Sequence, residues 1–166
     1  MVKVQTYFIL DNSKSKKTEA VELSQLTQSK VNEIKHQPVF PGYIEIKHNE
    51  QLILGKRYQD SVDHFWLSII DGLEKLKATG QYSIDYLYQP LTFHLYLKDT
   101  RLILSILHDQ TCLESWDLPK EQAIDSLLQA AEEFMTLIKK GSFTLFQSEV
   151  VSLQRKLVDL NTFYKI

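Results

Sequence analysis

Hydrophobic and polar residues alternate most regularly between Leu91 and His108. The alternation stops at Asp99–Thr100 and then resumes, which predicts a β-hairpin with one buried face. A two-residue turn there places apolar residues opposite one another in three pairs: Leu97 with Leu102, Leu95 with Leu104, and Phe93 with Ile106. Because a slip of one residue would turn this whole ladder outward, the pattern specifies the register of the hairpin.

Shorter period-two patterns predict further strands at residues 2–10, 82–88 and 112–116. Residues 43–54 form a second predicted hairpin, with Asn49–Glu50 as its turn. Residues 11–17 are polar and basic, as in a loop. The segment from Thr18 to Lys35 fits a helix capped by Thr18, although its density of Ser, Thr and Gln weakens the pattern.

The apolar residues between Asp60 and Thr79 recur at the spacing of one helix face. They are Val62, Phe65, Trp66, Ile69, Ile70, Leu73 and Leu76. Asp60 or Ser61 is expected to cap the first turn, and Gly80 suits the left-handed position after the last turn. Gly72 lies inside the helix, where glycine costs about 1 kcal/mol relative to alanine. We therefore expect Gly72 at a point of close packing.

Two further helices are predicted toward the end of the chain. One begins at Leu118–Pro119, since proline suits the first helical position, and ends at Gly141 after two lysines. The other covers residues 148–161, whose apolar residues share one face. The order of strands, helix, strands, helix, helix indicates an α+β fold, an antiparallel β-sheet meander with two or three amphipathic helices packed on it.

The length of 166 residues suits a single domain over 1–166, in which 1–41 is the segment least defined by its pattern. The formal net charge of −2 argues against a general affinity for nucleic acid or for an anionic membrane. No apolar run approaches the ~20 residues of a membrane-spanning helix, and the first ten residues lack a signal-peptide pattern. Together with the single cysteine, Cys112, these features predict a cytoplasmic protein.

We find no catalytic, metal-binding or cofactor-binding motif, so we predict no catalytic residue, no metal and no cofactor. Three groupings come nearest to such a motif: His94 with Ser105, His108 with Asp109 and Cys112, and Asp60 with Asp63 and His64. The first lacks an acid to orient the imidazole ring, and sequence proximity does not assure the geometry of the second. Carboxylates at the start of a helix complement its dipole, and this is sufficient to explain the two aspartates of the third grouping.

Two surface features remain as candidates for binding a partner. Acidic residues outnumber basic ones seven to one between residues 109 and 133. Their helical spacing indicates either an ordinary solvated face or a surface that steers a basic partner. Tyrosines near the predicted sheet either lie under a helix or act as interface anchors. The predicted partner-binding residues are Asp117, Glu121, Asp125, Glu132, Tyr86 and Tyr96.

Several stretches carry a resemblance to a known group of proteins. They are G-Y-I-E-I-K at 42–47, F-W-L-S-I-I-D-G-L-E-K-L at 65–76, Y-Q-P-L-T-F-H-L at 88–95 and S-W-D-L-P-K-E-Q-A-I at 115–124. The pattern, over about residues 42–140, resembles small proteins of low-GC Gram-positive bacteria that we associate with polymorphic-toxin immunity proteins. These stretches form core, so the resemblance implies a fold and assigns no functional residue.

The leading interpretation is therefore a non-enzymatic protein-interaction module, an immunity protein that binds and neutralises a cognate toxin domain. Its partner would be a protein with a basic surface, while neither nucleic acid nor membrane is expected. A further alternative is a homodimer in which the sheet faces of two copies pack against each other. The alternative is a small-ligand-binding domain or a hydrolase with a pocket between sheet and helices. A deep pocket lined by His94, Ser105 or Cys112 would favour this alternative, and a shallow acidic face the leading one.

Overall fold

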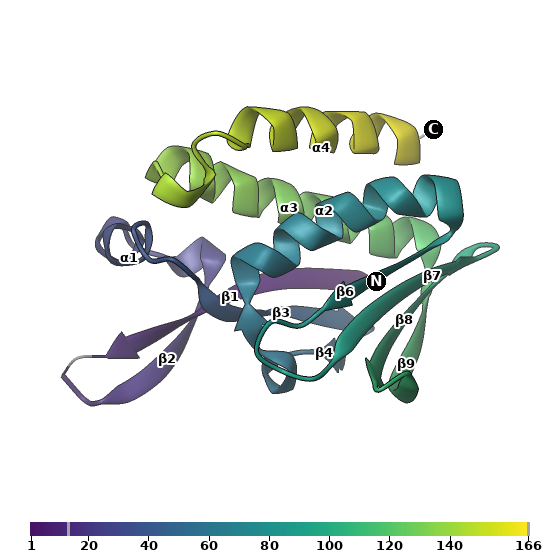
Figure 1. Cartoon of the computed structure of the whole chain (residues 1–166), viewed down its shortest axis with the longest axis horizontal. Helices are drawn as coiled ribbons and strands as arrows, with labels where there is room; N and C mark the ends of the chain where they lie inside the picture. Colours follow the sequence, from purple (N-terminus) through teal and green to yellow (C-terminus); the bar gives the residue numbers. More distant parts are fainter. Residues whose placement is uncertain (13, 166) are drawn as a thin grey trace.

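The computed structural model describes residues 1–12 and 14–165. The chain forms two antiparallel β-sheets that lie side by side beneath a layer of helices (Figure 1). This arrangement confirms the predicted α+β class with antiparallel pairing. The long helix at Val62–Thr79 separates the strands of the first sheet from those of the second along the chain.

The first sheet comes from the first part of the chain and has the order β2-β1-β3-β4, with β5 also beside β3. Its strands are β1 (Val2–Asn12), β2 (Lys17–Glu22), β3 (Pro41–His48), β4 (Gln51–Leu54) and β5 (Asp60–Ser61). The predicted β3–β4 hairpin is confirmed. Its turn residues Asn49 and Glu50 have φ angles of 49° and 65°, as in the tight turns that match strand twist.

The second sheet is a meander of β6 (Gln81–Asp85), β7 (Thr92–Lys98), β8 (Arg101–His108) and β9 (Thr111–Pro119). All three predicted apolar pairs of the central hairpin are confirmed: Leu97 with Leu102, Leu95 with Leu104, and Phe93 with Ile106. Most of these side chains are fully buried beneath the helices. The alternating pattern therefore set both the register and the buried face.

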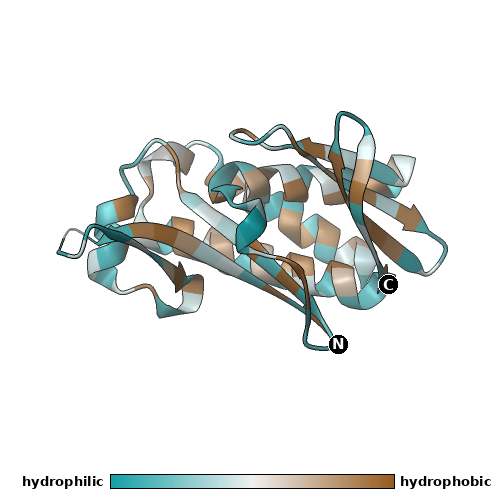
Figure 2. Cartoon of the chain, turned by 90° about the horizontal axis from the view of Figure 1, so that it is seen from below, coloured by the Kyte–Doolittle hydropathy of each residue, from teal (hydrophilic) through white to brown (hydrophobic). Residues whose placement is uncertain are grey.

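The helices cover one face of the sheets (Figure 1). They are α1 (Gln28–Ile34), α2 (Val62–Thr79), α3 (Lys120–Gly141) and α4 (Val150–Tyr164), with short 3-10 segments η1 (Leu23–Gln25), η2 (Lys56–Tyr58) and η3 (Thr144–Phe146). Helix α3 contacts β1 of the first sheet and β8 and β9 of the second, and α4 packs on α2 and α3. The opposite face, seen from below in Figure 2, presents both sheets without a helical cover. Across the described residues, every helix is too short or too polar to cross a membrane.

The core lies between the sheets and the helical layer. Trp66 of α2 is fully buried, and its ring stacks on Phe134 of α3 with centroids 6.3 Å apart. The indole nitrogen of Trp66 donates a hydrogen bond to the hydroxyl of Thr6 on β1 at 3.0 Å. This bond satisfies two polar groups that would otherwise be buried without a partner.

Both glycine predictions for α2 are confirmed. A side chain at Gly72 would overlap the ring of Tyr82 on β6, so the absence of one lets helix and strand approach closely. Gly80 ends the helix with φ of 72°, and its amide donates to the carbonyl of Leu76. A left-handed residue there follows the usual pattern of a helix C-terminus.

The helix predicted from Thr18 to Lys35 is wrong in its first half. Residues 17–22 form β2, paired with β1, and a helix appears only as α1. Its cap is Thr27, whose hydroxyl accepts a hydrogen bond from the amide of Lys30 at 3.3 Å. Pairing with β1, rather than the local sequence pattern, determines the strand conformation of residues 17–22. Tertiary contacts often have this effect on segments with a weak pattern.

The ends of three other elements differ from the prediction. Neither Asp60 nor Ser61 caps α2 with its side chain, because the Asp60 carboxylate instead accepts from the amides of Ser61 and Tyr88. Strand β6 ends at Asp85 rather than Tyr88. Pro119 ends β9 and immediately precedes α3, where the prediction placed it inside the helix.

Candidate functional site

The acidic residues predicted to bind a partner lie in two places. Glu121, Asp125 and Glu132 are on the exposed side of α3, with about 16 Å along the helix axis between the first and the last. Asp117 lies on β9, where its carboxylate pairs with Arg101 at 2.6 Å. The helix therefore gathers three of the four acids on one side, and Asp117 is already paired.

The two predicted tyrosine anchors have opposite surroundings. Tyr86 follows β6 in a loop and is only 6% exposed, with its ring 5.0 Å from that of Phe65. Burial raises its pKa well above the usual value of 10.0. Tyr86 is therefore a core residue rather than a surface anchor, because the chain turns inward where the strand ends. Tyr96 is 41% exposed on the outer face of β7.

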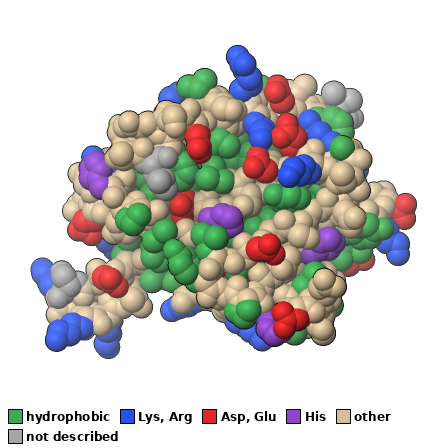
Figure 3. All heavy atoms as spheres, viewed as in Figure 1, with side chains coloured by type: hydrophobic (Ala, Val, Ile, Leu, Met, Phe, Trp, Pro, Cys, Tyr) green, Lys and Arg blue, Asp and Glu red, His purple; other side chains and the backbone are tan. Residues whose placement is uncertain are grey.

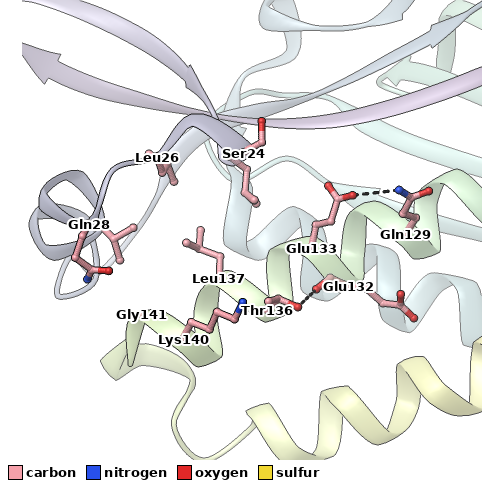
Figure 4. A pocket seen from close by; sticks show the side chains of 12 residues that line it. Ser24, Leu26, Gln28, Gln129, Glu132, Glu133, Thr136, Leu137, Lys140 and Gly141 are labelled. Atoms are coloured by element: carbon pink, nitrogen blue, oxygen red, sulfur yellow. Dashed lines mark hydrogen bonds between the residues drawn. The ribbon is translucent and has the colours of Figure 1, made fainter.

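A groove separates α3 from the segment formed by η1 and α1 (Figure 4). It has a volume of about 540 Å³. Its apolar lining comes from both sides: Leu23, Leu26 and Val31 from the η1–α1 side, and Leu137 from α3. Its polar lining on α3 includes Gln129, Glu132, Glu133, Thr136 and Lys140. The groove thus combines an apolar interior with the acidic residues of α3.

Local sequence explains why the groove exists. Gly141 lies where α1 crosses the end of α3, and a side chain there would overlap Phe143 and Val31. Close packing at Gly141 joins the two helices at one end of the groove. Toward the other end, η1 leaves Leu23 and Leu26 only partly buried against the core. The two segments consequently diverge and leave apolar side chains accessible between them.

Hydrogen bonds position the carboxylates of the groove. The amide nitrogen of Gln129 donates to Glu133 at 3.2 Å (Figure 4), and Asn161 of α4 donates to Glu132. Lys140 lies one helical turn past Thr136, toward the closed end. Figure 4 shows the Glu132 carboxylate directed toward α4 rather than into the groove. A carboxylate such as that of Glu133 beside apolar side chains can receive a segment that is both apolar and basic, through contact and charge.

Positive charge gathers elsewhere on the molecule. Figure 3 shows Lys and Arg side chains at the lower left, around the tip of the β1–β2 hairpin, where the exposed lysines of 14–17 lie. Acidic and basic side chains mix over α2 and α4, where Lys156 pairs with Asp71 at 2.6 Å and Glu74 at 3.0 Å. The acids of the α3 groove thus remain distinct from the basic hairpin tip.

The side chains considered for catalysis form hydrogen bonds mainly outside their own groupings. His94 and Ser105 are cross-strand neighbours, as predicted, but the His94 ring bonds Ser83 at 2.8 Å and Ser105 bonds Ser115 at 3.0 Å. Both lie on the outer face of the second sheet, away from the helices. Cys112 is exposed, and its thiol bonds only a nearby carbonyl among described partners.

The groupings weighed for a metal also have other partners. The Asp63 carboxylate accepts from the amide of Phe40 at 3.2 Å and from the hydroxyl of Ser61, and a ring nitrogen of His64 lies 3.1 Å from the carbonyl of Asp85. In the part of the chain that the structure describes, no cluster of three His, Cys, Asp or Glu side chains is arranged to hold a metal ion.

Side chains fill the space between sheet and helices where the alternative interpretation expects a pocket. Phe93, Leu95 and Ile106 have no exposed surface. A hollow near Gly42 and Phe65 measures about 10 Å³, roughly the space of one water molecule. The groove beside α3 is far larger and lies outside this packed interface.

Most residues that line the groove were not among the predicted site residues. Glu133 belonged to the acidic run but was not selected, and Leu137 lies beside the apolar stripe of α3. Both could have been found from the helix pattern. The exposure of Leu23 and Leu26 could not be predicted, because the sequence indicated a continuous helix where the structure has the short segment η1. The groove depends on segments more than a hundred residues apart.

Comparison of the chain with known proteins yields no match to a family model, to a curated protein or to a solved structure.

Proposed function

We propose that this chain is a non-enzymatic protein-interaction module that binds a partner protein through the groove between η1–α1 and α3. The observation that carries the proposal is the meeting of accessible Leu26 and Leu137 with Glu133 in one hollow. The carboxylate of neighbouring Glu132 points toward α4 (Figure 4) and adds negative charge on the other side of the helix. Apolar contact supplies affinity, and the carboxylates select a basic segment. The sequence resemblance to immunity proteins specifies this proposal further: the partner is a toxin domain, and the module is its immunity protein.

The remaining acids of α3 have a role in this proposal. Glu121 and Asp125 continue the exposed stripe away from the groove. Charges at the rim of an interface raise the rate of encounter more than the final affinity. We therefore assign steering to these two residues together with the carboxylates of the groove, and anchoring to the apolar side chains of the groove.

The groove alone is smaller than a complete protein interface. A stable complex buries roughly 1,200–2,000 Å² in total, so surrounding surface must take part. A second hollow of about 240 Å³ lies between α3 and α4 and shares Glu132 and Thr136 with the groove. Val158 at this hollow is 64% exposed. The two hollows flank one ridge of α3 and extend the apolar surface on both sides of it.

A small-ligand site is the second candidate. Its supporting observation is the groove volume of about 540 Å³, since small-molecule sites usually measure roughly 300–1,000 Å³. A ligand of this kind would raise the melting temperature of the pure protein without any protein partner. We further propose that the module acts in the cytoplasm, because its one cysteine is exposed and unpaired in the structure.

The experiment is affinity capture from lysate of the source organism, with tagged wild-type protein and two variants as baits. The double variant Glu132→Lys/Glu133→Lys reverses the charge of the groove. Asp109→Lys/Asp159→Lys changes two exposed acids outside the groove lining and serves as the charge-matched control. We expect one stoichiometric partner that wild type and control retain and the double variant loses. Equal capture by all three baits would contradict binding at the groove.

A further inference from the structure

Strand β1 has a free edge over its first residues. It pairs with β3 from Val2 to Phe8, but with β2 only from Tyr7 to Asn12. Among the described residues, no strand pairs with Val2–Thr6 on the side where β2 lies farther along. An unpaired edge of this kind presents backbone donors and acceptors that can pair with another strand.

The hydrogen-bond pattern identifies the backbone groups on that edge. The amide of Asn49, at the end of β3, donates to the carbonyl of Met1 at 3.0 Å. Backbone groups of an antiparallel strand alternate between its two edges, so those of Val2 and Val4 face away from β3. Consistently, the hydroxyl of Ser126 on α3 donates to the carbonyl of Val2 at 2.9 Å. The amide and carbonyl of Val4 are therefore aimed at the free edge.

A hollow of about 470 Å³ lies directly beside this edge. It is bounded by residues 1–5 of β1, by Glu22 and Ser24 at the end of β2, and by the side of α3 from Ser126 to Glu133. Ser24, Gln129 and Glu133 also line the groove between η1–α1 and α3. The free edge and the groove are therefore parts of one continuous depression along α3.

We propose that an extended segment of the partner protein pairs with the free edge of β1 as an added strand, in line with β2. This inference rests on the proposed function and specifies how the partner is held. Backbone hydrogen bonds to the amide and carbonyl of Val4 supply sequence-independent affinity, as in other strand-addition complexes. The segment continues into the groove, where apolar side chains meet Leu26 and Leu137.

Charge defines the chemistry of the added segment. The depression carries the carboxylates of Glu22 and Glu133 where the free edge ends, with Lys3 at the start of the edge and Lys140 at the far end of the groove. The segment therefore alternates apolar with basic residues and lacks proline at the positions whose amides face β1. A strand of about five residues spans the free edge, at roughly 3.3 Å per residue.

The test uses the intact protein and a phage-displayed library of random twelve-residue peptides. Enriched peptides are synthesised in two forms, one N-methylated at odd positions and one at even positions within the same central stretch. An added strand directs alternate amides toward β1, so we expect one form to bind at least about tenfold more weakly and the other to stay within about threefold. Amide hydrogen exchange read by NMR is the second measurement. We expect at least about tenfold slower exchange at Val4 in the complex.

The outcomes separate this inference from the proposed function. One outcome is that peptides lose affinity for Glu133→Lys but not for Asp159→Lys, yet bind equally in both methylated forms and leave the Val4 amide unprotected. This outcome would overturn the added strand and leave the groove as a binding site. Enriched peptides with a helical apolar spacing would overturn it in the same way. A library that yields no peptide sensitive to Glu133→Lys would overturn both proposals.

Discussion

Individual residues in this protein resolve conflicts between local preference and packing. Gly72 is a poor helix residue in the middle of α2, yet the ring of Tyr82 occupies the space that a side chain would need. Trp66 brings a polar nitrogen into the core, and Thr6 accepts its hydrogen. In both cases the residue type makes sense only beside its partner on a strand. Local rules of helix propensity are therefore overridden at the points where α2 meets the sheets.

Gly72→Ala tests this reading of close packing. Alanine would improve helix propensity by about 1 kcal/mol, but overpacking typically costs about 1–3 kcal/mol. We expect a net loss of about 1 kcal/mol in the free energy of unfolding, measured by urea titration. In a Tyr82→Ala background, which vacates the space, the same substitution should be stabilising. Stabilisation by Gly72→Ala in the wild-type background would contradict the packing role.

Tyr164 offers a test through pH. Its hydroxyl donates to the carbonyl of Leu73 at 2.8 Å, and burial raises its pKa from 10.0 to about 12. A raised pKa means that the folded state favours the protonated form. Its contribution to stability is therefore complete below pH 10 and is lost as pH rises toward 12. Tyr164→Phe should lose less stability than wild type between pH 9 and pH 12, as followed by urea titration. Parallel losses in the two proteins would contradict the raised pKa.

Elements with strong local patterns were predictable, and elements created by distant pairing were not. The β7–β8 hairpin and α2 followed from apolar periodicity, which also fixed which faces they bury. Strand β2 was missed because its conformation comes from pairing with β1 rather than from its own pattern. The groove was missed for a related reason, since it lies between η1–α1 and a helix a hundred residues later. The exposed acidic stripe of α3 was the one part of the site visible in the sequence.

The β3–β4 turn allows a prediction at the element scale. Glu50 has φ of 65°, a left-handed conformation that costs a non-glycine residue roughly 1–2 kcal/mol. Glu50→Gly creates the Asn-Gly pair that such turns prefer. We expect about 0.5–1 kcal/mol of added stability. Thr100→Gly is the control, because Thr100 occupies the second position of the β7–β8 turn but does not itself have a positive φ. We expect this substitution to lower stability. Destabilisation by Glu50→Gly would show that its side chain matters more than its backbone.

At the scale of the whole molecule, α3 connects the two sheets. It packs on β1 of the first sheet and on β8 and β9 of the second, while α2 and α4 cover the same layer. The groove and the free edge of β1 both lie along α3. The helix that organises the fold thus also carries the proposed binding surface, so a rigid α3 presents both parts in fixed relation.

This connection predicts one cooperative unfolding transition. Trp66 of α2 packs against the first sheet and Trp116 lies on β9 of the second, so single-tryptophan variants report on the two sheets separately. Fluorescence of Trp66→Phe and Trp116→Phe proteins should each coincide with the far-UV circular dichroism of the same variant during urea unfolding. Two transitions in either variant would indicate that the sheets unfold independently and that residues 1–166 are not a single domain.

The most direct test of the proposed function is the association rate of the captured partner as a function of salt. We expect Glu132→Lys/Glu133→Lys to slow association by about tenfold or more at low salt and to flatten its salt dependence, because the steering charge is reversed. The charge-matched control Asp109→Lys/Asp159→Lys should remain close to wild type. Association that is equally fast and equally salt-dependent in all three proteins would contradict binding through the acidic groove of α3.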